Sequence, residues 1–489
     1  MTEGASASST IARGWWPSVL FFAVFAASRA LAAACGLTFC SEHAAQIMHF
    51  PELELLRDRL LETVWHLHGQ PPGPSLVLGA LLKLAGDDWP RWAAWLFHGL
   101  GALAGLSLLT VLRELGMRAR PALAVALGFV LLPSVLVYEH YAFTTLPVAA
   151  LLLLAAVPLV RSRGTSAVRA GLFLLVAALV LNVRNVFHLV WWVACLLLVL
   201  RTWRGSRRAL LLASLLPALV AVAPYAKNAL VHGRFEASSW SGFGLARKTY
   251  HQDELAVRAD EALRGLREPI QAVPVFGSVE EFALVVLVVP PTGVPVLDRP
   301  RKANGFVNYH HALVAEASAR MREAAWADLQ KRPERYVADV LRTVPIFFAP
   351  SSEWWPVVAP RAQLGSYATT IDTVLHTPWL AGLGFWAWGT FVVLLASVPA
   401  VWRVLRRGPK AARADVLVAF AVGTYVYLAL AAVLLDTNEV MRHRLKVDGL
   451  LLIAAAILGL GRTQRGIGTS SNSRSSGPLG TASAASTGS

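Results

Sequence analysis

The sequence predicts an all-α polytopic membrane protein with about ten transmembrane helices, amphipathic helices on the outer face and a mainly α extracytoplasmic domain. Of its 489 residues, 55% are hydrophobic and only 15% are charged, and the mean hydropathy is +0.51. Soluble domains carry about 25% charged residues, so this composition excludes an ordinary soluble domain. The apolar residues also fall into long blocks, and every second loop between the blocks is basic.

Ten apolar blocks are candidate transmembrane helices, because a bilayer core about 30 Å thick requires roughly 20 residues of helix. Two short blocks, 169–183 and 186–200, are separated by the polar pair Arg184 and Asn185, which we interpret as a tight turn between two helices. The blocks lie at 15–38, 92–112, 122–138, 143–160, 169–183, 186–200, 209–230, 379–402, 414–435 and 447–461.

The distribution of charge predicts the topology. Alternate loops and the two termini together hold 19 basic and 2 acidic residues, whereas residues 233–378 hold 16 of each and residues 39–91 hold 4 basic and 7 acidic. The positive-inside rule therefore predicts a protein of the plasma membrane or cell inner membrane whose two termini both lie in the cytoplasm. The net charge of +15 is then a topology signal. The basic residues are dispersed among short loops, which excludes a nucleic-acid partner.

The same topology divides the chain into regions. Within the large outer region, residues 312–342 have helical composition with a break at Pro333, and the Val- and Pro-rich stretch 269–300 predicts short strands or loops. The regions are a cytoplasmic tail at 1–14, a transmembrane region at 15–232 with a first outer loop at 39–91, an extracytoplasmic domain at 233–378, C-terminal transmembrane helices at 379–461 and a disordered cytoplasmic tail at 462–489.

Two further helices are expected in the first outer loop. Residues 52–68 carry leucines and a valine on one helical face and charges on the other, which predicts an amphipathic helix at the membrane surface. The alternative is a helix that packs on the outer domain. The apolar stretch 74–86 is interpreted as an outer-leaflet helix that does not cross, because crossing would place the basic cluster around Arg113 outside.

Charged side chains beside the apolar blocks gather at the predicted outer ends. Glu139, Arg184 and Lys227 lie at the ends of the third, fifth and seventh blocks, and six charged residues lie between Asp436 and Asp448 in the last outer loop. Such groups cost several kcal/mol inside a bilayer, so they are functional candidates. The alternative for each one alone is an interfacial anchor.

This face suits transfer from a lipid-linked phosphate, whose oxygens guanidinium and ammonium groups bind. A nearby carboxylate, Glu42 or Glu139, would act as the base that accepts a proton from an incoming hydroxyl. Further substrate contacts are assigned to His68, Gln70, Tyr138 and Glu439. The candidate phosphate ligands are Arg184, Lys227, Arg442, Arg444 and Lys446.

Four short sequence motifs occur one after another along the chain, and their order is part of the resemblance described next. They are HGQPP at 68–72, PYAKN with the following HGRF at 224–235, KRPERY at 331–336, and NEVMRHRLKVD at 438–448. Together they resemble the motifs of polytopic GT-C glycosyltransferases, in particular bacterial family-39-like enzymes related to protein mannosyltransferases and the lipid A aminoarabinose transferase. The resemblance covers most of residues 15–461.

The resemblance implies a GT-C-like fold, a sugar donor on polyprenyl phosphate, and inversion at the anomeric carbon. The acceptor, a glycan, lipid or protein, would approach from the outer face. The resemblance also implies an acidic base just after the first transmembrane helix. The chain departs from the pattern there, because Glu42 is the nearest carboxylate in place of the usual Asp. Gln70 stands where some relatives have Lys, which removes one phosphate contact.

This chemistry requires no cofactor, and a divalent cation stays an open alternative. The pairs His66 with His68 and His310 with His311 lack a carboxylate cluster that would indicate a metal site. One alternative function is a secondary transporter, although such proteins often show internal repeats and sites at the bilayer midplane. The other is a catalytically inactive GT-C homologue that acts as a membrane scaffold, which the missing Asp favours.

Overall fold

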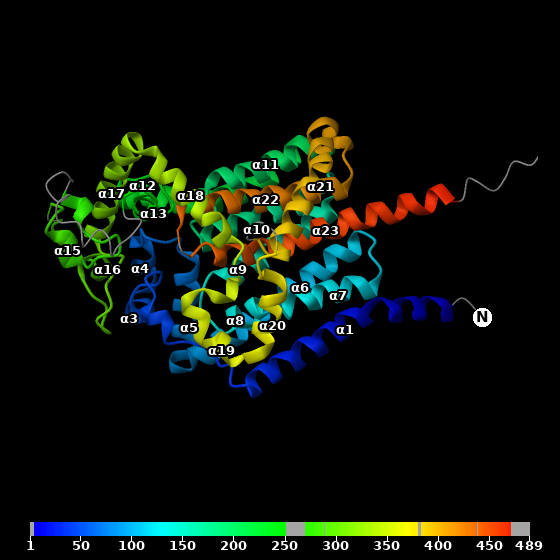
Figure 1. Cartoon of the computed structure of the whole chain (residues 1–489), viewed down its shortest axis with the longest axis horizontal. Coiled ribbons are helices and arrows are strands. Elements are labelled where there is room, and N and C mark those ends of the chain that lie inside the picture. The colour runs from blue at the N-terminus through cyan, green and yellow to red at the C-terminus, as the bar shows by residue number, and fades with distance from the viewer. Residues whose placement is uncertain (1–3, 251–268, 288, 380–382, 438, 471–489) are drawn as a thin grey trace, which may run out of the picture.

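The computed structural model describes residues 4–250, 269–287, 289–379, 383–437 and 439–470, and the described residues form an all-helical fold (Figure 1). The only β pairing among them consists of two isolated bridges, Cys40 with Tyr141 and Arg301 with Val307. The predicted all-α class is therefore confirmed.

Where the structure describes them, nine of the ten predicted apolar blocks each fall largely within one helix of the bundle. The prediction of one helix over 122–138 is wrong, because α7 and α8 meet at Pro133 with a bend of 59°. The turn expected at 184–185 is confirmed, since it separates α10 from α11. The bundle consists of α1 (Gly4–Ala34), α6 (Trp89–Glu114), α7 (Ala119–Val130), α8 (Pro133–Glu139), α9 (Thr145–Ser162), α10 (Ala167–Val183), α11 (Leu189–Thr202), α12 (Arg207–His232), α21 (Phe385–Arg407), α22 (Arg413–Leu435) and α23 (Met441–Ser470).

Six helical segments among the described residues are long and apolar enough to cross a membrane, or seven if α7 and α8 form one span. The ten spans that we expected are not confirmed, because α10 and α11 are shorter apolar helices. One of the six segments joins α5 (Gly73–Ala85) to α6 through the turn at 86–88. That α5 stays in the outer leaflet remains a prediction.

The bundle buries its centre and exposes apolar side chains outside. Most residues of α9 are buried, and this helix packs against α6, α10 and α23. By contrast, Leu219 of α12 is 71% exposed and Leu395 of α21 is 73% exposed. Exposed leucines on long apolar helices are the surface that lipid chains cover in a membrane protein.

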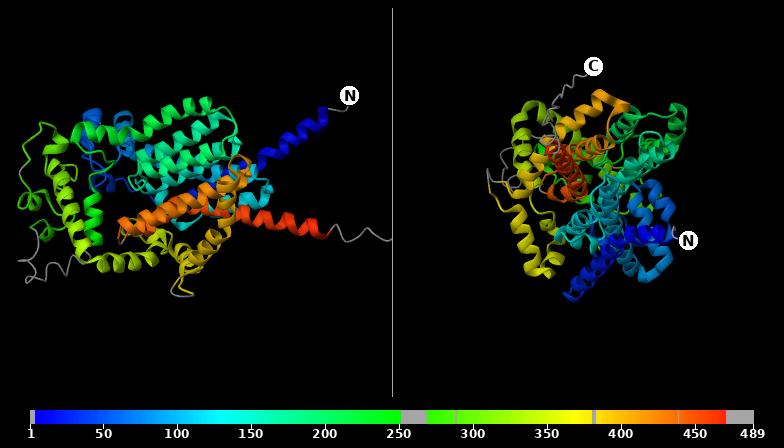
Figure 2. Two further views of the ribbon diagram at one scale, coloured as in Figure 1. Left: turned by 90° about the horizontal axis from the view of Figure 1, so that it is seen from above. Right: turned by 90° about the vertical axis from the view of Figure 1, so that its right-hand side faces the viewer.

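We call residues 233–378 the outer layer, after their predicted side of the membrane. The described part of 241–331 lies at one end of the bundle, and residues 358–376 pack beside α8 and α21. The start of α1 and the end of α23 lie at the end opposite to 241–331 (Figures 1 and 2). The break predicted at Pro333 is confirmed between α17 and α18. The stretch 269–300 contains short helices and loops rather than strands where it is described. The outer helices are α13 (Ser241–Lys248), α15 (Val279–Ala283), α16 (Pro295–Asp298), α17 (Ala312–Lys331), α18 (Pro333–Phe347), α19 (Val358–Gln363) and α20 (Gly365–His376).

The first outer loop forms α2 (His43–Gln46), α3 (Leu53–Asp58) and α4 (Leu60–His66). The predicted single helix over 52–68 is thus two helices. Its apolar side chains, including Leu56 and Leu67, are buried in a cluster with residues of α5 and α16. This packing contradicts the interpretation of that face as membrane-bound and supports the alternative, because the protein itself supplies the apolar partner.

The chain ends fit the predicted regions only in part. The tail expected at 1–14 belongs largely to α1, which begins at Gly4. The disordered tail was expected to begin at 462, but α23 continues to Ser470, and the remaining tail lies outside the described residues.

Gly242 marks the closest approach of α13 to α17, because a Cβ there would clash with the carbonyl oxygen of Ser318. Overpacking of this kind costs about 1–3 kcal/mol, so Gly242→Ala is expected to lower the Tm of the purified protein in detergent. Gly99→Ala in α6 is the control, because its Cβ would meet nothing within 4 Å. Equal Tm values for the two variants would contradict the packing of α13 on α17.

Candidate functional site

A cavity of about 500 Å³ lies where the outer layer meets the bundle. Segments that are distant in sequence form its walls. They come from the first outer loop, the turn between α10 and α11, the outer helices, and the loop between α22 and α23. The lining residues used below are His43, His49, Gln70, Arg184, His188, Tyr225, Glu236, Trp240, Trp354, Trp355, Ala431, Leu435, Asp436, Glu439, Arg442 and His443.

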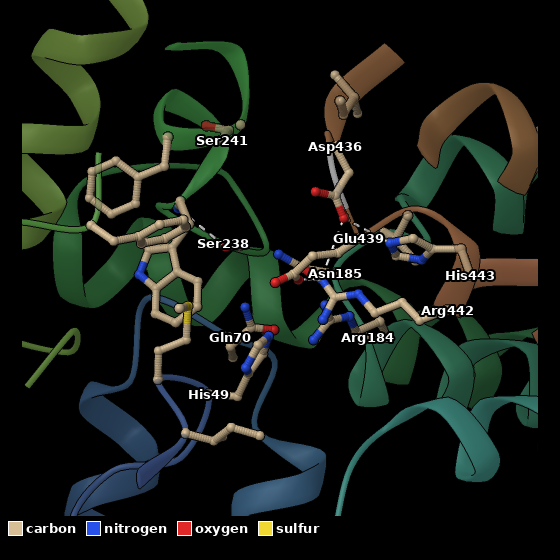
Figure 3. A pocket seen from close by; sticks show the side chains of 18 of the residues that line it. His49, Gln70, Arg184, Asn185, Ser238, Ser241, Asp436, Glu439, Arg442 and His443 are labelled. Carbon is tan, nitrogen blue, oxygen red and sulfur yellow. Dashed lines mark hydrogen bonds and ion pairs between the residues drawn. The ribbon is translucent and has the colours of Figure 1, made fainter. Parts of the chain in front are cut away.

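Two arginines share one aromatic ring in this cavity. The guanidinium carbon of Arg184 lies 5.1 Å from the ring centroid of Phe143, and that of Arg442 lies 5.4 Å from the same centroid. Arg442 also lies over Trp354, at 4.8 Å. Figure 3 shows the two guanidinium groups next to one another, with His49 and Gln70 across from them. We call Arg184 and Arg442 the arginine pair.

The arginine pair is buried and incompletely hydrogen-bonded. Arg184 is 4% exposed and Arg442 is 5% exposed. In each of them Nε and Nη1 are buried without a hydrogen-bond partner among the described residues. Buried donors are nearly always paired in proteins, and two buried cations repel each other. Two buried cations with unpartnered N–H groups form an environment that suits an anion with several acceptor oxygens.

Electrostatics support this assignment. Burial, followed by the nearby charge of Arg442, lowers the pKa of Arg184 to about 9. Arg184 still carries its charge at neutral pH, because this value lies above 7. An anion bound between the two arginines would remove the repulsion that lowers this pKa, so the site gains from binding negative charge.

Local structure explains where the arginine pair sits. Arg184 directly follows α10 in an extended conformation, and its carbonyl accepts a hydrogen bond from the backbone N–H of Phe187 at 3.2 Å. The following helix, α11, is fixed by two hydroxyl groups: that of Tyr225 accepts from the N–H of Leu189, and that of Tyr427 accepts from the N–H of His188, both at 2.9 Å. Arg442 lies in the first turn of α23.

Each carboxylate that lines the cavity already has a partner. Glu439 forms an ion pair with Arg442, with 3.0 Å between Oε2 and Nη2, and accepts a hydrogen bond from Trp355 Nε1 at 3.1 Å. Asp436 lies 3.0 Å from His443 Nε2. Burial opposes the ionisation of Asp436, but the hydrogen bond with His443 and the charge of Arg442 outweigh it and lower its pKa. Glu236 pairs with Arg322 at 2.9 Å.

Four of the predicted site residues line the cavity: Gln70, Arg184, Glu439 and Arg442. Two more lie next to residues of the cavity wall without lining it. Tyr138 stacks on Trp354 and donates to the carbonyl of Ser351 at 3.2 Å, and Lys446 lies 2.7 Å from His443 Nδ1. Arg444 does not line the cavity either: it donates to the carbonyl of Phe348 at 2.9 Å and lies 3.4 Å from Asp448.

Two further predicted ligands form contacts of the first outer loop instead, His68 with the outer layer and Lys227 of α12 with the loop itself. His68 Nδ1 lies 2.6 Å from Ser239 Oγ, and its Nε2 lies 2.9 Å from the carbonyl of His310. Burial lowers the pKa of His68 to about 3, so it is a neutral structural residue. Lys227 donates to the carbonyl of Leu67.

The structure brings neither predicted base to the cavity wall. Glu42 is exposed, and it is the adjacent His43 that lines the cavity. Glu139 is fully buried inside the bundle, where Arg29 Nε donates to its Oε2 at 2.8 Å and His98 lies 3.2 Å away. These two carboxylates therefore do not face the arginine pair.

Sequence reasoning did not single out Phe143, Trp354 or His49. Phe143 begins the predicted apolar block 143–160, and nothing around His49 marks it as functional in the sequence. The described residues contain no group of three or more His, Cys, Asp or Glu that could hold a metal ion.

No protein-family model matches this chain, and no curated protein matches it. Among solved structures, it is similar to an oligosaccharyltransferase of Archaeoglobus fulgidus, crystallised with a tethered acceptor peptide, with 13% sequence identity and a TM-score of 0.30. The match covers 94% of this chain and 51% of the other, so the chain spans about half the length of that protein.

Proposed function

We propose that the protein is an integral membrane glycosyltransferase, which transfers a sugar from a polyprenyl-phosphate-linked donor to an acceptor at the extracytoplasmic face. The observation that carries this proposal is the arginine pair, two buried cations with unpartnered N–H groups that face one cavity. Phosphate oxygens accept hydrogen bonds from guanidinium groups in bidentate geometry.

The cavity walls suit the other parts of such a donor. Ala431 and Leu435 belong to α22, and Tyr225 belongs to α12, so one side of the cavity consists of candidate membrane helices. A prenyl chain would lie along these helices. The aromatic rings of Trp240 and Trp355 also line the cavity, and an aromatic ring suits the apolar face of a sugar.

The arginine pair has a direct chemical role in this proposal. When the bond between the sugar and the phosphate breaks, the leaving phosphate gains negative charge. Fixed cations at that position stabilise the transition state more than the ground state, and this difference accelerates the reaction. Gln70 lines the same cavity and would donate a hydrogen bond to the phosphate or the sugar without adding charge.

Turnover in vesicles tests this proposal. The purified protein is reconstituted with a panel of polyprenyl-phosphate hexoses and pentoses, and release of polyprenyl phosphate is measured together with the glycans and lipids of cells with and without the gene. We expect one donor to be consumed and one glycan or lipid to lose its sugar when the gene is deleted. Movement of an intact solute across the vesicle, without donor cleavage, would contradict the proposal and favour a transporter.

One observation favours a second candidate, a protein that binds lipid phosphate without transferring the sugar. The three carboxylates that line the cavity, Glu236, Asp436 and Glu439, are all held in ion pairs. A non-catalytic scaffold would bind polyprenyl phosphate in the same vesicles, yet cleave no donor.

A further inference from the structure

The transfer proposed above needs a group that accepts the proton of the incoming hydroxyl, and this inference rests on that proposed function. A carboxylate whose oxygens are already engaged by fixed partners has no lone pair directed at an incoming hydroxyl. Glu439 is paired with Arg442, Asp436 with His443, and Glu236 with Arg322. The carboxylates that line the cavity are therefore poor candidates.

Four histidines line the cavity: His43, His49, His188 and His443. Two of them already have polar partners. His443 lies between Asp436 and Lys446, with one ring nitrogen toward each, at 3.0 and 2.7 Å. His188 Nδ1 lies 2.7 Å from the hydroxyl of Tyr427.

Of the other two, His49 is nearer to the arginine pair. Its ring centroid lies 5.0 Å from that of Phe143, the ring on which both Arg184 and Arg442 lie. His43 instead contacts Tyr141, at 5.3 Å. His49, Arg184 and Arg442 thus surround a single aromatic ring.

His49 is held in place without using its ring nitrogens. Its ring packs between Phe143 and Trp240, the latter at 5.7 Å. Lys302 donates to the carbonyls of Ala45 and Ile47 at 3.0 and 2.9 Å, which fixes the segment just before it. No described residue forms a hydrogen bond with either ring nitrogen, and Nδ1 is a buried nitrogen without a partner.

The environment keeps His49 neutral. Burial, and then the charges of Arg184 and Arg442, lower its pKa well below the usual value, with His310 and Lys446 acting in the same direction. A neutral imidazole has a lone pair that can accept a proton.

We propose that His49 is the general base of the transfer, positioned beside the arginine pair. The acceptor oxygen forms a bond to the anomeric carbon while the bond from that carbon to the phosphate oxygen breaks. The electron pair of the broken bond stays on the phosphate, and the acceptor proton passes to the free imidazole nitrogen of His49.

The charges balance during this step. His49 gains a positive charge close to two cations, which alone would be unfavourable. The leaving phosphate gains a negative charge between those same cations at the same time. Proton transfer to His49 is therefore coupled to donor cleavage, and a free phosphate already bound there would favour the protonated ring.

The test compares His49→Ala and the closer-sized His49→Asn with wild type and with His66→Asn, a control histidine outside the cavity lining. General-base removal costs roughly 10² to 10⁴-fold in rate, so we expect donor cleavage to fall at least 100-fold in both His49 variants. Binding of polyprenyl phosphate in vesicles should stay within about threefold, and added imidazole should restore part of the activity of His49→Ala alone. The binding measurement also verifies that the variants fold.

Either of two outcomes would overturn the assignment of His49 as the base while leaving the proposed function intact. The first is that both His49 variants cleave the donor at the wild-type rate. The second is that Glu42→Gln loses cleavage at wild-type stability and that imidazole does not rescue His49→Ala. If wild type cleaves no donor of the panel, the proposed function fails and the inference fails with it. The wild-type reaction therefore separates the two failures.

Discussion

Arg184→Gln is expected to weaken the binding of polyprenyl phosphate about 10 to 100-fold, since a hydrogen bond to a charged group contributes about 1.5–3 kcal/mol. The same substitution should raise the Tm of the ligand-free protein. It removes a buried cation that lies beside Arg442 and forms no ion pair with a described residue. The measurement is titration of vesicles that contain polyprenyl phosphate, together with thermal unfolding in detergent. Weaker binding with higher stability is typical of a site whose residues serve a ligand.

Arg442→Gln should differ from Arg184→Gln in one respect. It too should weaken binding, but it also leaves Glu439 without its ion-pair partner and removes one of the partners of Asp436, which keeps His443, so the Tm should fall. The control is Arg57→Gln, because Arg57 is exposed and its one ion pair with a described residue is to Asp87. Unchanged binding in both arginine variants would contradict the phosphate site. Equal losses in the control would indicate nonspecific attraction to the anionic vesicle.

Glu139→Ala is expected to cause the largest loss of stability, about 3–5 kcal/mol, because it leaves the buried charge of Arg29 uncompensated. Arg29 is 7% exposed and its guanidinium lies 3.8 Å from the ring centroid of Phe25. Water therefore cannot replace Glu139 as the partner of this guanidinium. The measurement is the Tm in detergent and the amount of protein in the membrane fraction.

The double variant Arg29→Leu/Glu139→Leu provides the control for this prediction. Removing both charges leaves no uncompensated ion, so it should recover most of the stability that Glu139→Ala loses. A Glu139→Ala protein with wild-type Tm but no donor cleavage would contradict the structural role. It would also restore Glu139 as a candidate base.

The sequence located the arginine pair through one physical rule, that charged groups at the ends of apolar blocks are costly and seldom accidental. The rule selected five candidate phosphate ligands, and the structure brings two of them, Arg184 and Arg442, to one cavity. It could not separate them from Glu139, because the partner that neutralises Glu139 is Arg29, which lies 110 residues earlier. Ion pairs between residues far apart in the sequence determine which charged side chains remain available to a ligand, and a single sequence does not show these pairs.

Helix geometry was predictable to a similar degree. The apolar blocks predicted the positions of the helices, and the polar pair Arg184 and Asn185 predicted the turn between α10 and α11. The bend between α7 and α8 has a visible cause in Pro133, which cannot continue a helix from Leu132. His49 had no such signal, since its position beside Phe143 depends on how the first outer loop packs against the bundle.

The walls of the cavity have a consequence for the biogenesis of the protein. Arg184 follows α10, whereas Arg442 lies in α23. A nascent chain that has not yet inserted α23 therefore holds only one of the two arginines. In the proposed function, the lipid carrier would be captured only after α23 has entered the membrane.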